Sequence, residues 1–139
     1  MFKILLTTHG ELCEGMLKTA KIFTEDVSHI KAIPFYGEDD TYDPNAELEQ
    51  FISELQAEDV VIVLTDILWG SVNQKIFLNL NNKENVHIIT GLNLPLLLEM
   101  ITLDAEQVSQ AVISEKVKSC KESMVYMREY TIVDNDEDE

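Results

Sequence analysis

The segment Asp59–Thr65, with the sequence DVVIVLT, constrains the fold more than any other part of the chain. Its Val, Ile and Leu side chains occupy both faces of an extended segment, and β-branched residues favour strands. A strand that is apolar on both faces is typical of a parallel sheet covered by helices on either side. We therefore expect an α/β protein with this segment as a central strand.

Further short apolar segments predict the other strands of the sheet. They are Phe2–Thr7, Ser28–Phe35 and Val86–Thr90, and Tyr130–Val133 could add an edge strand. Strands that alternate with helices imply right-handed crossovers and parallel pairing. The expected fold class is an α/β three-layer sandwich, with a mostly parallel central sheet of four strands and a C-terminal edge strand.

The segments between these strands carry apolar residues at helical spacing. After the first strand, the expected stripe comprises Leu12, Met16, Ala20 and Phe23. Asp43 followed by Pro44 predicts the start of the next helix, because Asp accepts hydrogen bonds from first-turn amides and Pro needs no acceptor there.

Two polar pairs have the spacing of a capping box, in which a short polar side chain and a Gln or Glu three residues later bond each other's backbone amides. Ser71 with Gln74 predicts the start of the helix after the central strand. Asp104 with Gln107 predicts the start of a long amphipathic helix that ends near Met127.

Composition excludes several classes of protein. The 139 residues include 10 Lys and Arg against 26 Asp and Glu, a formal net charge of −16. This balance argues against binding to nucleic acid or to an anionic membrane, which depends on basic contacts to phosphates. The longest apolar run, Leu94–Leu98, is too short to span a bilayer, so no membrane insertion is expected.

Cysteine usage and the C-terminus bear on compartment and domain organisation. Cys13 and Cys120 lie far apart with no CxxC motif and no His/Cys cluster, so neither a disulfide scaffold nor a metal site is expected. We expect a cytoplasmic protein with one domain over residues 1–133. The acidic run at 134–139 is expected to be a disordered tail.

The ends of the predicted strands indicate where a site would form. In open parallel sheets, sites lie outside the carboxyl ends of the strands, near the point where the strand order reverses. This rule selects the loops Thr8-His9-Gly10, Asp66–Ser71 and Gly91–Pro95. If the first and third strands pair, His9 and Asp66 lie at neighbouring strand ends.

These loops carry the residue types that a histidine nucleophile needs. An imidazole with the ordinary pKa of about 6.5 can attack through one nitrogen if an acceptor holds the hydrogen of the other, and Asp66 can do so for His9. Amides near Gly10, Gly70 and Ser71 could receive an anion.

No Ser or Cys nucleophile motif, Walker loop or dinucleotide fingerprint is present. The residues favour transfer of an anionic group, such as phosphoryl, through His9. A structural histidine beside a capping aspartate is the alternative.

Four motifs at strand ends occur in a specific order: Thr8-His9-Gly10, Gly37-Glu38-Asp39, Asp66 with Gly70-Ser71, and Gly91-Leu92-Asn93-Leu94-Pro95 followed by Leu97-Leu98-Glu99. In this order they resemble the IIA component of the mannose-type sugar phosphotransferase system, a bacterial phosphocarrier family. The resemblance covers most of the chain up to about Ile101. The chain departs from the family's Gly-Gly-Ser-Pro at Trp69 and Val72, where Trp69 adds bulk at a backbone turn, and Tyr36 replaces a proline.

The resemblance implies a function and partners. His9 would accept a phosphoryl group through Nε2 from the phosphohistidine of the carrier protein HPr. It would pass the group to a histidine of the IIB component, which phosphorylates sugar as it enters through the membrane IIC/IID complex. Asp66 would support the ring and Ser71 would lie beside the phosphate, with no cofactor. Family members are homodimers that exchange a C-terminal strand, which corresponds to Tyr130–Val133 here.

Three other functions share parts of this pattern. A receiver-like signalling domain would be phosphorylated on Asp66, but it needs acidic residues after the first strand, where this chain has Thr-Thr-His-Gly. A flavin or nucleotide module would use the same crevice, but the Ser/Thr-rich phosphate loop of a flavodoxin is absent. A phosphotransferase subunit of dihydroxyacetone kinase also has a histidine after its first strand, and Gly91–Pro95 favours the mannose type instead. The residues do not indicate which sugar is transported.

Overall fold

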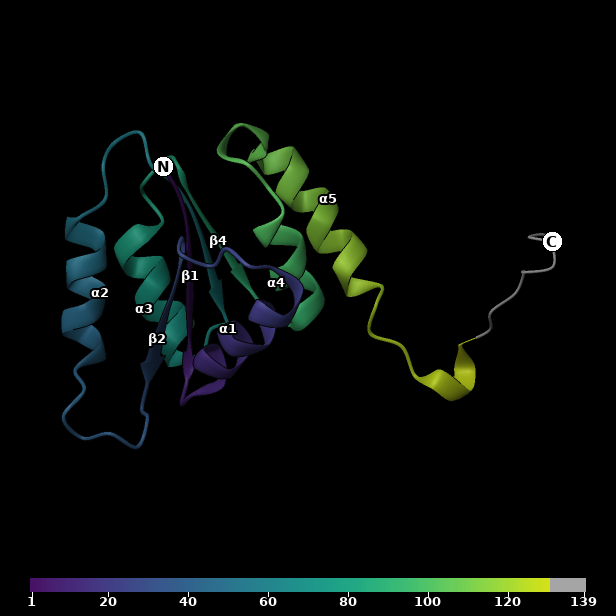
Figure 1. The fold of residues 1–139 in the computed structure, drawn as a ribbon, viewed down its shortest axis with the longest axis horizontal. Helices are drawn as coiled ribbons and strands as arrows, with labels where there is room; N and C mark the ends of the chain where they lie inside the picture. The colour runs from purple at the N-terminus through teal and green to yellow at the C-terminus, as the bar shows by residue number, and fades with distance from the viewer. Residues whose placement is uncertain (131–139) are drawn as a thin grey trace.

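The computed structural model describes residues 1–130, and the order of elements alternates between strands and helices. The elements are β1 (Phe2–His9), α1 (Leu12–Phe23), β2 (Ile30–Phe35), α2 (Pro44–Ser53), β3 (Val60–Thr65), α3 (Ser71–Leu80), β4 (Val86–Thr90), α4 (Leu94–Ile101), η1 (Ala105–Gln107), α5 (Gln110–Lys121) and η2 (Met127–Glu129). The predicted α/β three-layer class is confirmed, with helices on both faces of one sheet (Figure 1).

The sheet has four strands in the order β2-β1-β3-β4, and all neighbouring pairs are parallel. The strand order reverses between β1 and β3, because the chain moves to β2 on one side and to β4 on the other. In this register Thr7 pairs with Thr65, so His9, the last residue of β1, and Asp66, which follows β3, emerge side by side. The fold therefore creates its switch point where His9 and Asp66 lie.

Two apolar cores cover the two faces of the sheet. Ile4 and Leu6 of β1 pack with residues of α1, α4 and α5, whereas Leu5 packs with residues of α2 and α3. Figure 1 shows the same division, with α2 and α3 on one side of the strands and α4 and α5 on the other. The β3 residues 61–65 are all fully buried, as the two-sided apolar pattern predicts. Burying each such aliphatic side chain contributes about 1.5–3 kcal/mol, which makes β1 and β3 a rigid base for their loops.

The buried face of α1 differs from the predicted stripe. Leu12 and Phe23 are 51% and 60% exposed, whereas Cys13 and Ala20 are fully buried. The reason is a local bond, because the Cys13 amide donates to the Thr8 hydroxyl at 2.9 Å. This contact fixes the rotation of the first turn, so Cys13 rather than Leu12 faces the sheet.

The starts of α2 and α3 test two capping predictions. The Asp43 cap is confirmed, because its carboxylate accepts from the amides of residues 45 and 46. The capping box at Ser71 and Gln74 is wrong. Gly70 is the N-cap and has no side chain to form the box, and the side-chain Nε2 of Gln74 donates to the Trp69 carbonyl at 2.7 Å instead.

The predicted long helix from Asp104 to Met127 is also wrong. Asp104 and Gln107 do form a capping box, but it closes only the 3₁₀ turn η1. The backbone at Val108 is extended, so the helical path breaks there and α5 starts afresh under a Ser109 cap. Met127 lies in η2, beyond the end of α5.

The remaining predictions concern the C-terminus and membranes. Tyr130 has extended backbone, while residues 131–133 of the predicted strand and the acidic tail at 134–139 lie outside the described residues. Within residues 1–130, no helix has both the length and the hydrophobicity that crossing a bilayer requires.

Candidate functional site

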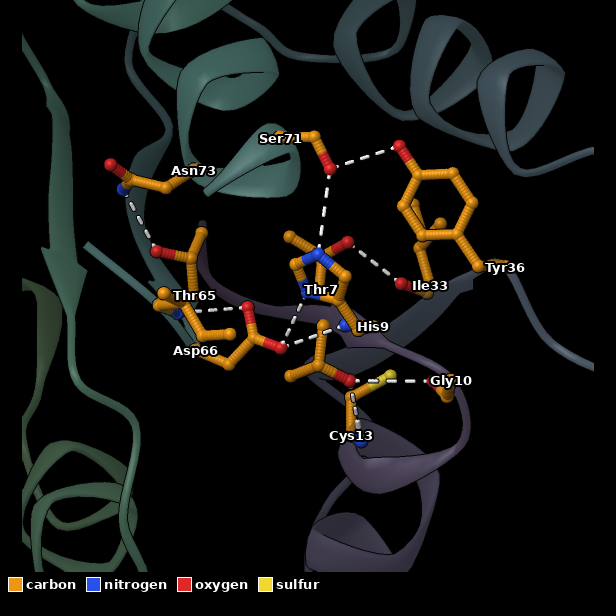
Figure 2. A network of polar contacts seen from close by, with 12 residues as sticks. Thr7, His9, Gly10, Cys13, Ile33, Tyr36, Thr65, Asp66, Ser71 and Asn73 are labelled. Carbon is orange, nitrogen blue, oxygen red and sulfur yellow. Dashed lines mark hydrogen bonds and ion pairs between the residues drawn. The ribbon is translucent and has the colours of Figure 1, made fainter. Parts of the chain in front are cut away.

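The His9 and Asp66 side chains meet at the carboxyl ends of β1 and β3, as the sequence predicts (Figure 2). One carboxylate oxygen, Oδ2 of Asp66, accepts from the His9 backbone amide at 2.8 Å and lies 2.9 Å from ring Nδ1. The other oxygen, Oδ1, accepts from the Ile67 amide at 2.9 Å. The carboxylate is thus fixed by three N–H groups.

This geometry decides which ring nitrogen of His9 can react. An ionised carboxylate can only accept, so Nδ1 carries the hydrogen and Nε2 keeps its lone pair. The His9 side chain is 38% exposed, while that of Asp66 is only 10% exposed. The nucleophilic nitrogen therefore belongs to an accessible ring, and the group that orients it is shielded.

Two opposing effects act on the Asp66 carboxyl. Burial raises its pKa, but the hydrogen bonds from the His9 amide, the His9 ring and the Ile67 amide outweigh burial, so the pKa lies below the ordinary value. Asp66 is therefore ionised at neutral pH. A fixed negative charge beside Nδ1 stabilises positive charge on the ring when Nε2 forms a new bond.

Ser71 faces the reactive side of the ring. Its Oγ lies 3.4 Å from His9 Nε2 and accepts a hydrogen bond from the Tyr36 hydroxyl at 3.0 Å. Ser71 is the first residue of α3, and the first amides of a helix have no acceptor within the helix. A hydroxyl and a helix N-terminus are groups that favour an anion, so an anionic substituent on Nε2 would meet both.

Gly10 and Gly70, the other two predicted phosphate-binding residues, lie in the loops beside His9 and Ser71. Their amides already donate to the carbonyls of Phe35, at 2.6 Å, and Ile67, at 2.9 Å. Gly10 has φ +61°, a conformation in which glycine has no steric cost, and a Cβ on Gly70 would lie 3.2 Å from the Ile67 carbonyl oxygen. Both glycines shape the loops, and their role in binding phosphate stays a prediction.

Asn73 is a site residue that the sequence reasoning missed. It is only 5% exposed, and its amide donates to the Thr65 hydroxyl at 2.9 Å. Its Oδ1 accepts from the Trp69 amide at 3.0 Å. These bonds tie the first turn of α3 to the end of β3 and thereby hold Ser71 near the ring. In the sequence, this role is indicated by a polar side chain next to the apolar residues of the helix that face the core.

Two aromatic residues border the site in a left-handed conformation. Tyr36 and Trp69, at φ 63° and 60°, are the two non-glycine residues with positive φ in the described part of the chain. Such strain costs about 1–3 kcal/mol per residue and concentrates at functional sites. The Trp69 ring packs edge-on against Phe77, with centroids 5.6 Å apart. Trp69 therefore extends along α3, and its bulk is directed to Phe77.

The other histidines and both cysteines have structural surroundings. His29 lies 5.7 Å from the Phe2 ring, and His87 lies inside β4, paired with Ile62. Burial raises the pKa of the Cys13 and Cys120 thiols, as expected of small buried residues. Within residues 1–130, no three His, Cys, Asp or Glu side chains are grouped as a metal ion would require.

Comparison with known proteins gives consistent matches. A family model described as the PTS system fructose IIA component matches residues 3–118. The PTS system fructose-specific EIIA component of Bacillus subtilis (strain 168) is 20% identical over 103 residues, which are 74% of this chain and 70% of that protein.

Two solved structures share the fold over nearly the whole chain. One is a candidate permease of the phosphoenolpyruvate-dependent sugar phosphotransferase system from Klebsiella pneumoniae subsp. pneumoniae, with a TM-score of 0.81, 27% identity and 92% of each chain covered. The other is a PTS IIA protein associated with the fucose utilization operon of Streptococcus pneumoniae. It has a TM-score of 0.76 and 26% identity, and the match covers 91% of this chain and 93% of that one.

The lowered pKa of Asp66 predicts how stability depends on pH. As the pH falls, the unfolded chain takes up a proton at Asp66 near the ordinary pKa of 3.8, before the folded protein does. The stability that ionised Asp66 contributes is present above that pKa and is lost as the pH falls through the lower folded pKa. Between about pH 5 and about pH 3, the native protein should lose more free energy of unfolding in urea than Asp66→Asn does.

Asp40→Asn is the matched control, because it removes the same charge from an exposed loop position. Its loss of stability over this range should follow that of the native protein. Equal losses in Asp66→Asn and Asp40→Asn would contradict the assigned hydrogen bonds.

Proposed function

Because the chain belongs to the family of the PTS system fructose IIA component, we propose that His9 is the residue through which it relays phosphoryl groups. The donor is phospho-HPr and the acceptor is a histidine of a IIB component, on the cytoplasmic side of the IIC/IID complex. The observation that carries this proposal is the pairing of His9 Nδ1 with Asp66 at 2.9 Å, which leaves Nε2 as the nucleophile.

The transfer step follows from that pairing. The Nε2 lone pair of His9 attacks phosphorus, and a new N–P bond forms as the donor's N–P bond breaks. The bonding electrons return to the donor's imidazole, so that ring becomes neutral while the His9 ring becomes cationic. The hydrogen stays on His9 Nδ1, donated to Asp66, throughout the step, and the carboxylate stabilises the new cation. Transfer to the IIB histidine repeats this step with His9 as the leaving ring.

The surface around His9 fits a protein substrate. The His9 side chain is 38% exposed at the carboxyl ends of the strands. The loops that carry the site and the start of α1 expose large apolar side chains, among them Leu12, Tyr36, Ile67, Leu68 and Trp69. An open apolar surface around a reactive ring suits docking of one protein domain on another.

The same geometry weakens the alternative of phosphorylation on Asp66. Both of its oxygens already accept hydrogen bonds, from two N–H groups of His9 and from the Ile67 amide. A carboxylate stabilised in this way is a poor nucleophile compared with an imidazole nitrogen that keeps its lone pair. A subunit of dihydroxyacetone kinase would share the histidine chemistry but not the IIB acceptor.

Reconstitution with phosphoenolpyruvate, enzyme I and HPr tests the proposal. The native protein should gain one phosphate per chain that is labile in acid and stable in alkali, as expected of phosphohistidine, and should pass it to a IIB component. His9→Ala should gain none, because the nucleophile is gone. Incorporation is measured with labelled phosphoenolpyruvate and by intact mass.

The chain provides matched controls, because it has only two other histidines. His29→Ala and His87→Ala should be phosphorylated like the native protein. Label that persists in His9→Ala would overturn the assignment, and an alkali-labile phosphate on Asp66 would support the receiver-like alternative.

The C-terminal segment supports the further proposal of a homodimer. Residues 122–130, which follow α5, extend away from the body of the protein (Figure 1). This segment exposes Met124, Val125, Tyr126, Met127 and Tyr130, which are between 42% and 86% exposed. At the β4 edge of the sheet, a hollow lined by Ile89, Leu96, Val117 and other residues is mostly apolar. A second copy could cover both apolar surfaces.

Truncation tests the dimer. A variant that ends at Ser123 lacks the exposed apolar segment and should sediment as a monomer at concentrations where the full chain is a dimer. A variant that ends at Val133 lacks only the acidic run and should remain a dimer. Equal masses for the full chain and the variant that ends at Ser123, in sedimentation equilibrium, would contradict this role of the segment.

A further inference from the structure

Tyr36 is an unassigned residue whose hydroxyl belongs to the polar network at the site. It donates to Ser71 Oγ at 3.0 Å, and Ser71 Oγ in turn lies 3.4 Å from His9 Nε2. The three side chains come from three separate segments: the end of β1, the start of α3 and the loop after β2. Figure 2 shows Tyr36 and Ser71 on the side of the His9 ring opposite Asp66.

The direction of the first hydrogen bond determines what Ser71 can do. A serine hydroxyl has one hydrogen to donate and two lone pairs that accept. Because Tyr36 donates to Ser71, the hydrogen of Ser71 remains available for another acceptor. The distance of 3.4 Å to His9 Nε2 is longer than an ordinary hydrogen bond, so that donor is only weakly engaged at the ring. A phosphoryl oxygen on Nε2 would be a stronger acceptor for it.

The aromatic ring of Tyr36 makes a second contact with His9. The two ring centroids lie 5.4 Å apart, with an angle of 36° between the planes. This separation lies within the range of about 4.5–7 Å for favourable aromatic pairs. His9 is therefore held by Asp66 through Nδ1 and by the Tyr36 ring through packing, which restricts rotation of the imidazole.

The backbone around Tyr36 explains why it stays in place. Tyr36 is 63% exposed and has φ 63°, so neither burial nor backbone preference accounts for a tyrosine at this position. The loop is fixed on both sides: Gly10 N donates to the Phe35 carbonyl at 2.6 Å, and Glu38 N donates to Glu11 Oε2 at 3.0 Å. A Cβ at position 37 would lie 2.7 Å from that oxygen, so a larger residue there would displace the Glu11 carboxylate from its contact with Glu38.

From these contacts we propose that Tyr36 is a positioning residue for phosphoryl transfer, acting through Ser71. Its hydroxyl directs the Ser71 hydrogen to the place that a phosphoryl oxygen on His9 Nε2 occupies. This inference rests on the proposed function of His9. In this chain, the hydroxyl that acts on Ser71 comes from Tyr36, at the loop position where the family resemblance predicts a proline.

A double-mutant cycle tests whether Tyr36 acts through Ser71. Tyr36→Phe keeps the ring and removes only the hydroxyl, so transfer from phospho-HPr should slow by about 3–10-fold, the value of one hydrogen bond. In the Ser71→Ala background, the same substitution should change the rate by less than about 2-fold, because the partner is already absent. Equal effects in the two backgrounds, or none in the native background, would overturn the proposal.

A second readout needs no phosphoryl donor. The ¹⁵N resonance of His9 Nε2 in the unphosphorylated protein should shift in Tyr36→Phe, whereas in the Ser71→Ala background the same substitution should cause no further shift. If HPr does not phosphorylate the native protein but this pattern holds, the proposed function fails while the Tyr36–Ser71 coupling stands. If HPr phosphorylates His9 and the resonance is insensitive to Tyr36→Phe, the coupling fails alone.

Tyr42→Phe is the matched control, because Tyr42 lies in the same loop between β2 and α2 but its hydroxyl is outside the network of Tyr36, Ser71 and His9. It should leave the transfer rate and the His9 resonance unchanged. Both Phe variants should keep the native melting temperature, since neither removes a buried group. A Tyr42→Phe effect as large as that of Tyr36→Phe would show that the rate does not depend on this network.

Discussion

The two hydrogen bonds that His9 gives to one oxygen of Asp66 depend on the pairing of β1 with β3. In the parallel register Thr7 pairs with Thr65, so His9 at the end of β1 meets Asp66, the residue that follows β3. A slip of one residue would turn each side chain to the opposite face and separate the pair. The apolar packing on both faces of β1 and β3 therefore fixes the geometry of the reactive ring as well as the stability of the fold.

In the proposed transfer, the tasks are divided among several elements around this pair. Asp66 orients the ring and would stabilise the cation, while Ser71 at the start of α3 places a hydroxyl 3.4 Å from Nε2. Asn73 connects that helix start to the end of β3. The strained backbone at Tyr36 and Trp69 borders the same opening, and the rigid sheet beneath supports both loops. The result is a reactive ring on an open surface.

The sequence predicted the parts of the structure that follow from strand patterns. The apolar run at residues 59–65 indicated the buried β3, and the rule for parallel sheets placed His9 beside Asp66. Contacts between loops could not be predicted in this way, because the bond from Tyr36 to Ser71 depends on a left-handed backbone that tyrosine rarely adopts. The length of α5 was overestimated for a similar reason, since the capping box at Asp104 closes a single 3₁₀ turn.

The central claim is that Asp66 fixes the hydrogen of His9 on Nδ1 and leaves Nε2 as the nucleophile. The ¹⁵N chemical shifts of the imidazole, recorded in alkaline solution, measure this tautomer directly. The account predicts a protonated Nδ1 and an unprotonated Nε2 in the native protein, and a mixture of tautomers in Asp66→Ala. A native His9 with its hydrogen on Nε2 would contradict it.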